Sequence, residues 1–96
     1  MTPEELQRRL HAGEPLFILD IREVQEYRQG HIPGAHLIPL WQLPVRLQDV
    51  PRDAEVVTVC RSGRRSAQAA AILRTHGYRV RNLRGGMLNW KGPTAR

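Results

Sequence analysis

The sequence predicts a single α/β domain, in which a mostly parallel sheet is flanked by helices. Helical stretches separate four short runs rich in apolar residues, so each connection between strands is expected to cross back over the sheet. The 96 residues, 41% of them hydrophobic, suffice for one hydrophobic core. We therefore expect one domain over residues 1–96. The predicted strands are residues 16–19, 35–38, 55–59 and 79–83.

The first half of the chain should contain two helices, two strands and some helical turns. These elements are expected at residues 2–11, 16–19, 23–29, 35–38 and 41–47. Thr2 suits the cap of the first helix, Pro3 suits its first position, and Glu5 would complete a capping box. The second helix is polar, and its Glu23 and Glu26 are expected to form a solvated face.

The second half repeats the alternation of strand and helix. A strand at 55–59 precedes the longest helix, which begins at Arg64 or Arg65 and ends at His76, before Gly77. Its alanines make a thin helix that can lie close to a sheet. A strand at 79–83, a tight turn at Gly85-Gly86 and a short helix from Met87 to Trp90 complete the fold. Trp41 and Trp90 are expected to pack in the core or at its rim, and Trp41 is also a candidate for the mouth of the pocket.

The charge and composition exclude several classes of function. The net charge is +6, but aromatic residues make up only 5% of the chain and the arginines are scattered, which argues against nucleic-acid binding. The first residues lack the basic and apolar regions of a signal peptide, and no apolar run is long enough for a membrane span. With a single cysteine and no such signal, we expect a cytoplasmic protein. His31 and His36 lack further ligands at suitable spacing, so no metal site is expected.

The chemistry is expected at the only cysteine, Cys60, which ends the third strand. It opens the loop Cys60-Arg61-Ser62-Gly63-Arg64-Arg65-Ser66, which leads into the longest helix. The N–H groups of such a loop and of a helix N-terminus favour an anion. They also lower the pKa of a thiol from its free value of about 8.5. The loop is therefore expected to present a reactive thiolate to an anion. The alternative is an inert core cysteine, a common fate of a lone one.

The other loop residues suit anion binding. Its arginines are Arg61, Arg64 and Arg65. Guanidinium groups fit a sulfonate-like dianion, so Arg61 and one of the other two are expected to hold the substrate, although surface arginines are commonly just solvated. Gly63 permits a backbone conformation that other residues avoid. Ser62 and Ser66 are candidate hydroxyl donors, and Ser66 is equally suited to starting the helix.

Asp20 and Arg22 follow the first strand, at the same edge of the sheet as Cys60. A carboxylate near a thiolate is a candidate acid or base. The structural interpretation is favoured for this pair, with Asp20 bonding backbone N–H groups or pairing with an arginine beneath the loop.

Three separated motifs make the chain resemble a known family. They are Leu19-Asp20-Ile21-Arg22-Glu23 with Gly30-His31-Ile32-Pro33-Gly34-Ala35, the Cys60 loop, and Leu83-Arg84-Gly85-Gly86-Met87 with Trp90. Over nearly its whole length the chain resembles the single-domain rhodaneses, a family of sulfurtransferases. The resemblance implies a five-stranded parallel sheet and a six-residue active loop, Cys60 to Arg65, with Cys60 as its nucleophile.

The resemblance also implies the reaction. Cys60 takes sulfane sulfur from a small anionic donor, such as thiosulfate or a persulfide, and holds it as a persulfide. It then passes the sulfur to cyanide or a thiol, or to a sulfur-relay protein. The thiolate and its leaving group are both anionic, so no cofactor, metal or general base is expected.

Two rival functions remain. A phosphatase or arsenate reductase of the Cys-loop-Arg type usually has arginine at the seventh position counted from the cysteine, where this chain has Ser66. A persulfide carrier or docking module would depend on a partner protein to make and use the persulfide.

Overall fold

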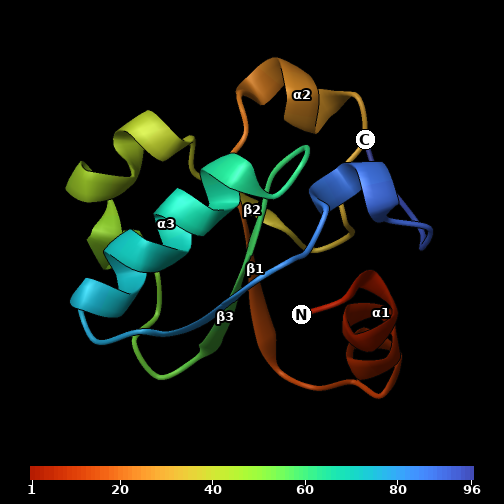
Figure 1. The fold of residues 1–96 in the computed structure, drawn as a ribbon, viewed down its shortest axis with the longest axis horizontal. Helices are drawn as coiled ribbons and strands as arrows, with labels where there is room; N and C mark the ends of the chain where they lie inside the picture. The colour runs from red at the N-terminus through yellow and green to blue at the C-terminus, as the bar shows by residue number, and fades with distance from the viewer.

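The computed structural model describes all 96 residues and has the expected α/β architecture (Figure 1). The strands are β1 (Leu16–Asp20), β2 (His36–Leu37), β3 (Glu55–Val59) and β4 (Arg79–Asn82). They form one parallel sheet in the order β2-β1-β3-β4. The helices are α1 (Pro3–His11), α2 (Val24–Arg28) and α3 (Arg64–Thr75), and the 3-10 helices are η1 (Leu40–Val45), η2 (Leu47–Asp49) and η3 (Gly86–Asn89).

Hydrophobic clusters lie on both faces of the sheet. One cluster joins residues of β1 and β3 to α3 and η1, and includes Ala69, Ala70 and Leu73. The small alanine side chains let α3 lie close to the strands, as the sequence predicts. The other cluster joins the opposite side of β1 and β3 to α1 and η3, through Leu6 and Trp90. Burial on both faces explains why the central strands are almost continuously apolar.

The sheet has four strands, so the expectation of five is wrong by one strand. The backbone of Met1 occupies the fifth position as a single residue: its amino group donates to the Asn82 carbonyl at 3.0 Å, and its carbonyl accepts from the Arg84 N–H at 2.8 Å. Thr2 already caps α1, with its hydroxyl accepting the Glu5 N–H at 3.1 Å. The cap at Thr2 turns the chain into α1 directly after Met1, so only this one residue pairs with β4.

The capping box lies in α2 and not in α1, contrary to expectation. The Glu5 carboxylate binds Arg81 at 2.8 Å and does not return to the cap of α1. In α2 the Glu26 carboxylate accepts the Glu23 N–H at 3.0 Å, and the Glu23 side chain reciprocates. This arrangement fixes the orientation of α2 beside the sheet.

The carboxyl ends of the four parallel strands meet at one end of the molecule. α2 follows β1, η1 follows β2, the Cys60 loop follows β3, and η3 follows β4. Figure 1 shows α2, the green loop before α3, and the blue η3 gathered at this end, opposite the start of β1. None of the helices is both long and apolar enough to cross a membrane.

Candidate active site

Cys60 lies directly after β3, at the bottom of a loop that curls around its sulfur. The Gly63 N–H donates to Cys60 Sγ at 3.0 Å, and the Ser66 hydroxyl donates to the same atom at 3.2 Å. Gly63 adopts a left-handed conformation (φ 99°) at the N-cap of α3, and this turns the chain around the sulfur. An inert core cysteine has no need of such donors, so this geometry favours a thiolate.

The pKa of Cys60 follows from two opposing influences. Burial raises the pKa and is the largest single influence, since it disfavours the charged thiolate. The Ser66 hydroxyl and the N–H groups of Ser66, Gly63 and Ser62 act in the other direction, and together they outweigh burial. The net pKa is therefore below its ordinary value, and the site favours a thiolate at lower pH than a free cysteine would.

The thiol is almost entirely buried, although the loop is expected to present it to an anion. Cys60 is only 1% exposed, and its carbon atoms belong to the core cluster on the α3 side. The cavities of the molecule lie elsewhere, and none is lined by residues 60–66. These cavities therefore do not lead to the sulfur, which is bonded to the Gly63 N–H and the Ser66 hydroxyl.

The glycine turn after β4 supports the loop from below. The Met87 N–H donates to the Cys60 carbonyl at 2.8 Å, and the Leu88 N–H donates to the Arg61 carbonyl at 3.0 Å. These bonds hold the two carbonyls away from the sulfur. Gly86 makes the close approach possible, because a β-carbon at this position would overlap the Cys60 and Arg61 carbonyls. The expectation that Gly85-Gly86 forms a turn beneath the site is met.

Two residues that the sequence analysis did not single out hold the loop in place. The Asn82 carboxamide donates to the Gly63 carbonyl at 3.0 Å. The Thr58 hydroxyl donates to the Ser66 carbonyl at 3.0 Å, and Thr58 is fully buried. Thr58 and Asn82 are polar residues near the ends of two neighbouring strands, β3 and β4. This is the only sequence signal that could have indicated their role.

We expect Asn82→Ala to lower the rate of any reaction of the Cys60 thiolate. The variant removes one of the two hydrogen bonds that the Gly63 carbonyl accepts and leaves the one from the Ala67 N–H at 3.2 Å, so the turn that aims the Gly63 N–H at the sulfur is held less firmly. The cost in unfolding free energy should be about 1 kcal/mol, typical of one hydrogen bond. The rate of Cys60 alkylation at neutral pH checks the first expectation, and unfolding in urea checks the second. An unchanged alkylation rate would show that Asn82 does not position the loop.

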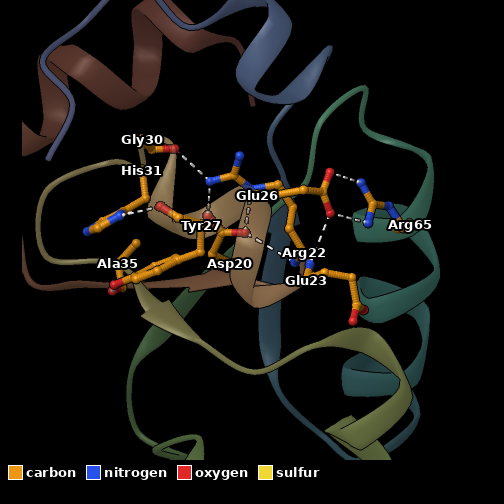
Figure 2. A network of polar contacts seen from close by, with 9 residues as sticks. All are labelled: Asp20, Arg22, Glu23, Glu26, Tyr27, Gly30, His31, Ala35 and Arg65. Carbon is orange, nitrogen blue, oxygen red and sulfur yellow. Dashed lines mark hydrogen bonds and ion pairs between the residues drawn. The ribbon is translucent and has the colours of Figure 1, made fainter. Parts of the chain in front are cut away.

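The loop arginines differ in their surroundings. Arg61 and Arg64 are exposed and form no side-chain hydrogen bond or ion pair, so their guanidinium groups are free to bind an anion. Arg65 is instead held by Glu26 in two bonds of 2.8 Å (Figure 2). The expected solvated face of α2 is therefore wrong for Glu26, whose carboxylate ties α2 to the start of α3.

The Glu26–Arg65 pair predicts a pH dependence of stability. Hydrogen bonding to Arg65 lowers the pKa of Glu26 to about 2, although partial burial opposes the shift. The pair therefore stabilises the fold fully above the ordinary value of 4.5, and this stabilisation is lost as the pH falls toward 2. We expect the difference in Tm between the wild type and Glu26→Gln to shrink over this range. Glu4→Gln, at an exposed position of α1, is the control.

Asp20 pairs with Arg22 beneath α2, and its carboxylate also accepts the Arg22 N–H at 3.2 Å, so both expected kinds of contact are present. Arg22 makes two side-chain bonds to the Asp20 carboxylate, at 2.8 and 2.7 Å, and a third to the Gly30 carbonyl at 2.9 Å. Figure 2 shows this pair between α2 and the turn that follows it. Both residues are buried. Their contacts fit structural support of the segment that carries Glu26, and the Asp20 carboxylate forms no hydrogen bond with Cys60.

The remaining polar groups offer no donor set for a metal. No three His, Cys, Asp or Glu side chains come close enough together to hold an ion. His31 instead stacks on Tyr27, with the ring centroids 3.7 Å apart, and its Nδ1 lies 2.9 Å from the Tyr27 carbonyl. The chemistry that this site can support is therefore that of a thiolate beside two free guanidinium groups.

Comparisons with known proteins place the chain among related domains. The family model described as "Rhodanese-like domain" matches residues 2–93. A protein of Allochromatium vinosum named "Sulfurtransferase" is 47% identical over 88 residues, covering 91% of this chain and 82% of the relative. The "Putative sulfur carrier protein YrkF" of Bacillus subtilis is 38% identical over 92 residues, which are 95% of this chain and 50% of that protein.

A solved structure agrees with the fold over its whole length. The crystal structure of a rhodanese-related protein from Thermoplasma volcanium superposes with a TM-score of 0.92 and 26% identity. The match covers 99% of this chain and 95% of the other.

Proposed function

The chain belongs to the rhodanese-like domain family, and on that premise we propose that it is a sulfurtransferase carrying sulfane sulfur on Cys60 as a persulfide. The hydrogen bonds that Cys60 Sγ accepts from the Gly63 N–H and the Ser66 hydroxyl carry this proposal. They stabilise a thiolate before the reaction. The same donors can stabilise the negative charge of a persulfide after it.

The first step loads the sulfur from a small anionic donor, for which we propose thiosulfate. The Cys60 thiolate attacks the outer sulfur of the donor, a new S–S bond forms, and the S–S bond of thiosulfate breaks. Sulfite leaves with the electron pair, so the total charge is unchanged and no proton moves. The free guanidinium groups of Arg61 and Arg64 bind the oxygens of the donor and of the departing sulfite. Arg65 contributes its charge while its side chain remains bonded to Glu26.

The second step unloads the sulfur to an acceptor nucleophile. Cyanide or a thiolate attacks the outer sulfur of the persulfide, the Cys60 Sγ–S bond breaks, and the Cys60 thiolate leaves. The Ser66 hydroxyl and the loop N–H groups stabilise this thiolate as it forms. In each step one anion attacks and another anion leaves, so the reaction needs no proton acceptor and no cofactor.

A second candidate is a persulfide carrier that exchanges sulfur only with partner proteins. The low accessibility of Cys60 and the Bacillus subtilis relative named as a sulfur carrier favour it. Such a carrier would have the same loop chemistry and would differ only in its sulfur donor. Sulfur-relay partners in the cytoplasm are expected under either candidate.

Intact-mass measurement after exposure to thiosulfate tests the proposal and separates the two candidates. A sulfurtransferase gains the mass of one sulfur atom on Cys60, releases sulfite, and forms thiocyanate when cyanide is added. A carrier gains no sulfur from thiosulfate but gains one from a persulfidated protein. If no donor of either kind adds sulfur to Cys60, both candidates fail.

An aryl phosphate assayed in parallel tests the Cys-dependent phosphatase. Such an enzyme is expected to have an arginine where this chain has Ser66, and here the Ser66 hydroxyl points at the sulfur instead. We expect no phosphate release. Faster turnover of the aryl phosphate than of thiosulfate would overturn the assignment.

A further inference from the structure

We propose that the end of the molecule around the Cys60 loop docks an acidic protein segment with apolar side chains, which takes up the sulfur on a cysteine thiol. This inference rests on the proposed sulfur transfer and specifies its acceptor. Three features of this end of the molecule carry it: exposed apolar side chains, unpaired arginines, and a buried sulfur without a cavity.

The exposed apolar side chains gather at one end of the sheet. All the large hydrophobic residues that are exposed follow the carboxyl end of a strand: Val24 in α2, Trp41 and Val45 in η1, and Leu88 in η3. Single exposed hydrophobic residues are common on any protein surface. Here none lies at the opposite end of the sheet, and the largest, Trp41, is 70% exposed.

The elements that carry these side chains neighbour the loop directly or through α3. The Leu88 N–H binds the Arg61 carbonyl, so η3 lies directly beside the loop. η1 packs against α3, the helix that follows the loop, and its Leu43 shares a cluster with Ala69, Ala70 and Leu73 of α3. An apolar segment of a partner can therefore contact η1 or η3 while it covers Cys60.

The charge at the centre of this surface selects an acidic partner. Arg61 and Arg64 are exposed and have no acidic partner within the chain, while the carboxylate of Glu26 is already neutralised by Arg65. The chain as a whole carries a net charge of +6. Carboxylates on the partner would complement the two free guanidinium groups and would steer its approach.

The burial of the sulfur favours a partner over an enclosed small molecule. Small ligands usually occupy a concave pocket, and none of the cavities here touches the loop. Persulfide formation moves the reactive atom outward by one S–S bond, about 2 Å. A docked segment can then place its thiolate against the outer sulfur. The thiolate bonds to that sulfur, the Sγ–S bond breaks, and Cys60 leaves as a thiolate, so that no oxidant or reductant is consumed.

The test compares three sulfur acceptors on persulfide-loaded protein. They are the acidic peptide Ac-Glu-Leu-Cys-Leu-Glu-amide, its counterpart with lysine in place of glutamate, and dithiothreitol. We expect kcat/KM for the acidic peptide to exceed that for the lysine peptide by about tenfold at low ionic strength, with the difference shrinking as salt is added. Equal rates with the two peptides would overturn the proposal.

A variant of the apolar surface provides the second arm. In Trp41→Ser combined with Val45→Ser, we expect kcat/KM for the acidic peptide to fall about fivefold, in line with the loss of an exposed aromatic contact. The rate of the double variant with dithiothreitol should equal that of the wild type. Arg8→Ser, a control in α1, should match the wild type with both acceptors. An equal loss with dithiothreitol would show that the substitutions act on the loop itself and would contradict docking.

Binding measured without transfer separates this inference from the proposed function. The acidic peptide with serine in place of cysteine is titrated while the fluorescence of exposed Trp41 is followed. A fluorescence change that is absent with the lysine peptide supports docking even if Cys60 never carries sulfur. If sulfur is transferred but neither peptide binds, the docking proposal alone is wrong.

Discussion

Replacing Cys60 with serine is expected to abolish sulfur transfer and to leave the fold intact. The serine hydroxyl is not ionised at neutral pH, so it cannot attack a donor or hold a persulfide. It is nearly the same size as the thiol and can still accept the Gly63 N–H, so the buried position stays filled and hydrogen-bonded. Thiocyanate formation from thiosulfate and cyanide, with the intact mass of the protein, measures the effect.

The control for this experiment is Arg8→Gln, an exposed substitution in α1, which packs on the opposite face of the sheet from α3. The rate of thiocyanate formation by Arg8→Gln should match that of the wild type. The Tm of both variants is measured as well, so that loss of activity in Cys60→Ser cannot be confused with unfolding. Sulfur transfer retained by the serine variant would remove Cys60 from the mechanism.

Gly86→Ala is expected to have the largest effect on stability. Gly86 has a left-handed backbone (φ 57°), and an added methyl group would overlap the Cys60 and Arg61 carbonyls that η3 holds in place. The strain and the overlap together should lower the unfolding free energy by about 2–5 kcal/mol. They should also shift the loop that surrounds the sulfur, so transfer per folded molecule falls too. Urea unfolding followed by the transfer assay checks both.

Gly34→Ala is a matched control for this variant. Gly34 also has a left-handed backbone (φ 85°), but an added β-carbon would meet nothing within 4 Å. The unfolding free energy of Gly34→Ala should therefore fall by only about 1–2 kcal/mol, the cost of a left-handed alanine. Sulfur transfer by the folded protein should be normal. Equal losses of stability and activity in the two variants would contradict the role assigned to Gly86.

The elements of the fold could be predicted because each leaves a local pattern. The apolar run 55–59 corresponds to β3 at both ends, and Gly63 and Gly77 flank the helix expected after it. The resemblance implied a fifth strand. In the structure a single residue, Met1, takes the place of that strand, and the resemblance does not show this. Local patterns also placed the Cys60 loop and its supporting turn at the same edge of the sheet.

The site could be predicted only in part, because its other contacts join residues far apart in sequence. Arg65 binds Glu26 at a separation of 39 residues, and Asn82 binds Gly63 at a separation of 19. A sequence pattern shows that these side chains are polar but does not show which way they point. The sequence left Trp41 between the core, its rim and the mouth of the pocket, and its 70% exposure excludes the core.

Donors converging on Cys60 are expected to lower the pKa of its thiol despite burial. A pH titration of the thiolate by its ultraviolet absorbance, in the wild type and in Ser66→Ala, tests it most directly. The account predicts a midpoint below that of a free cysteine in the wild type and a higher midpoint in Ser66→Ala, because the variant loses a hydroxyl donor to the sulfur. A wild-type midpoint at or above the free value, unchanged by the substitution, would contradict it.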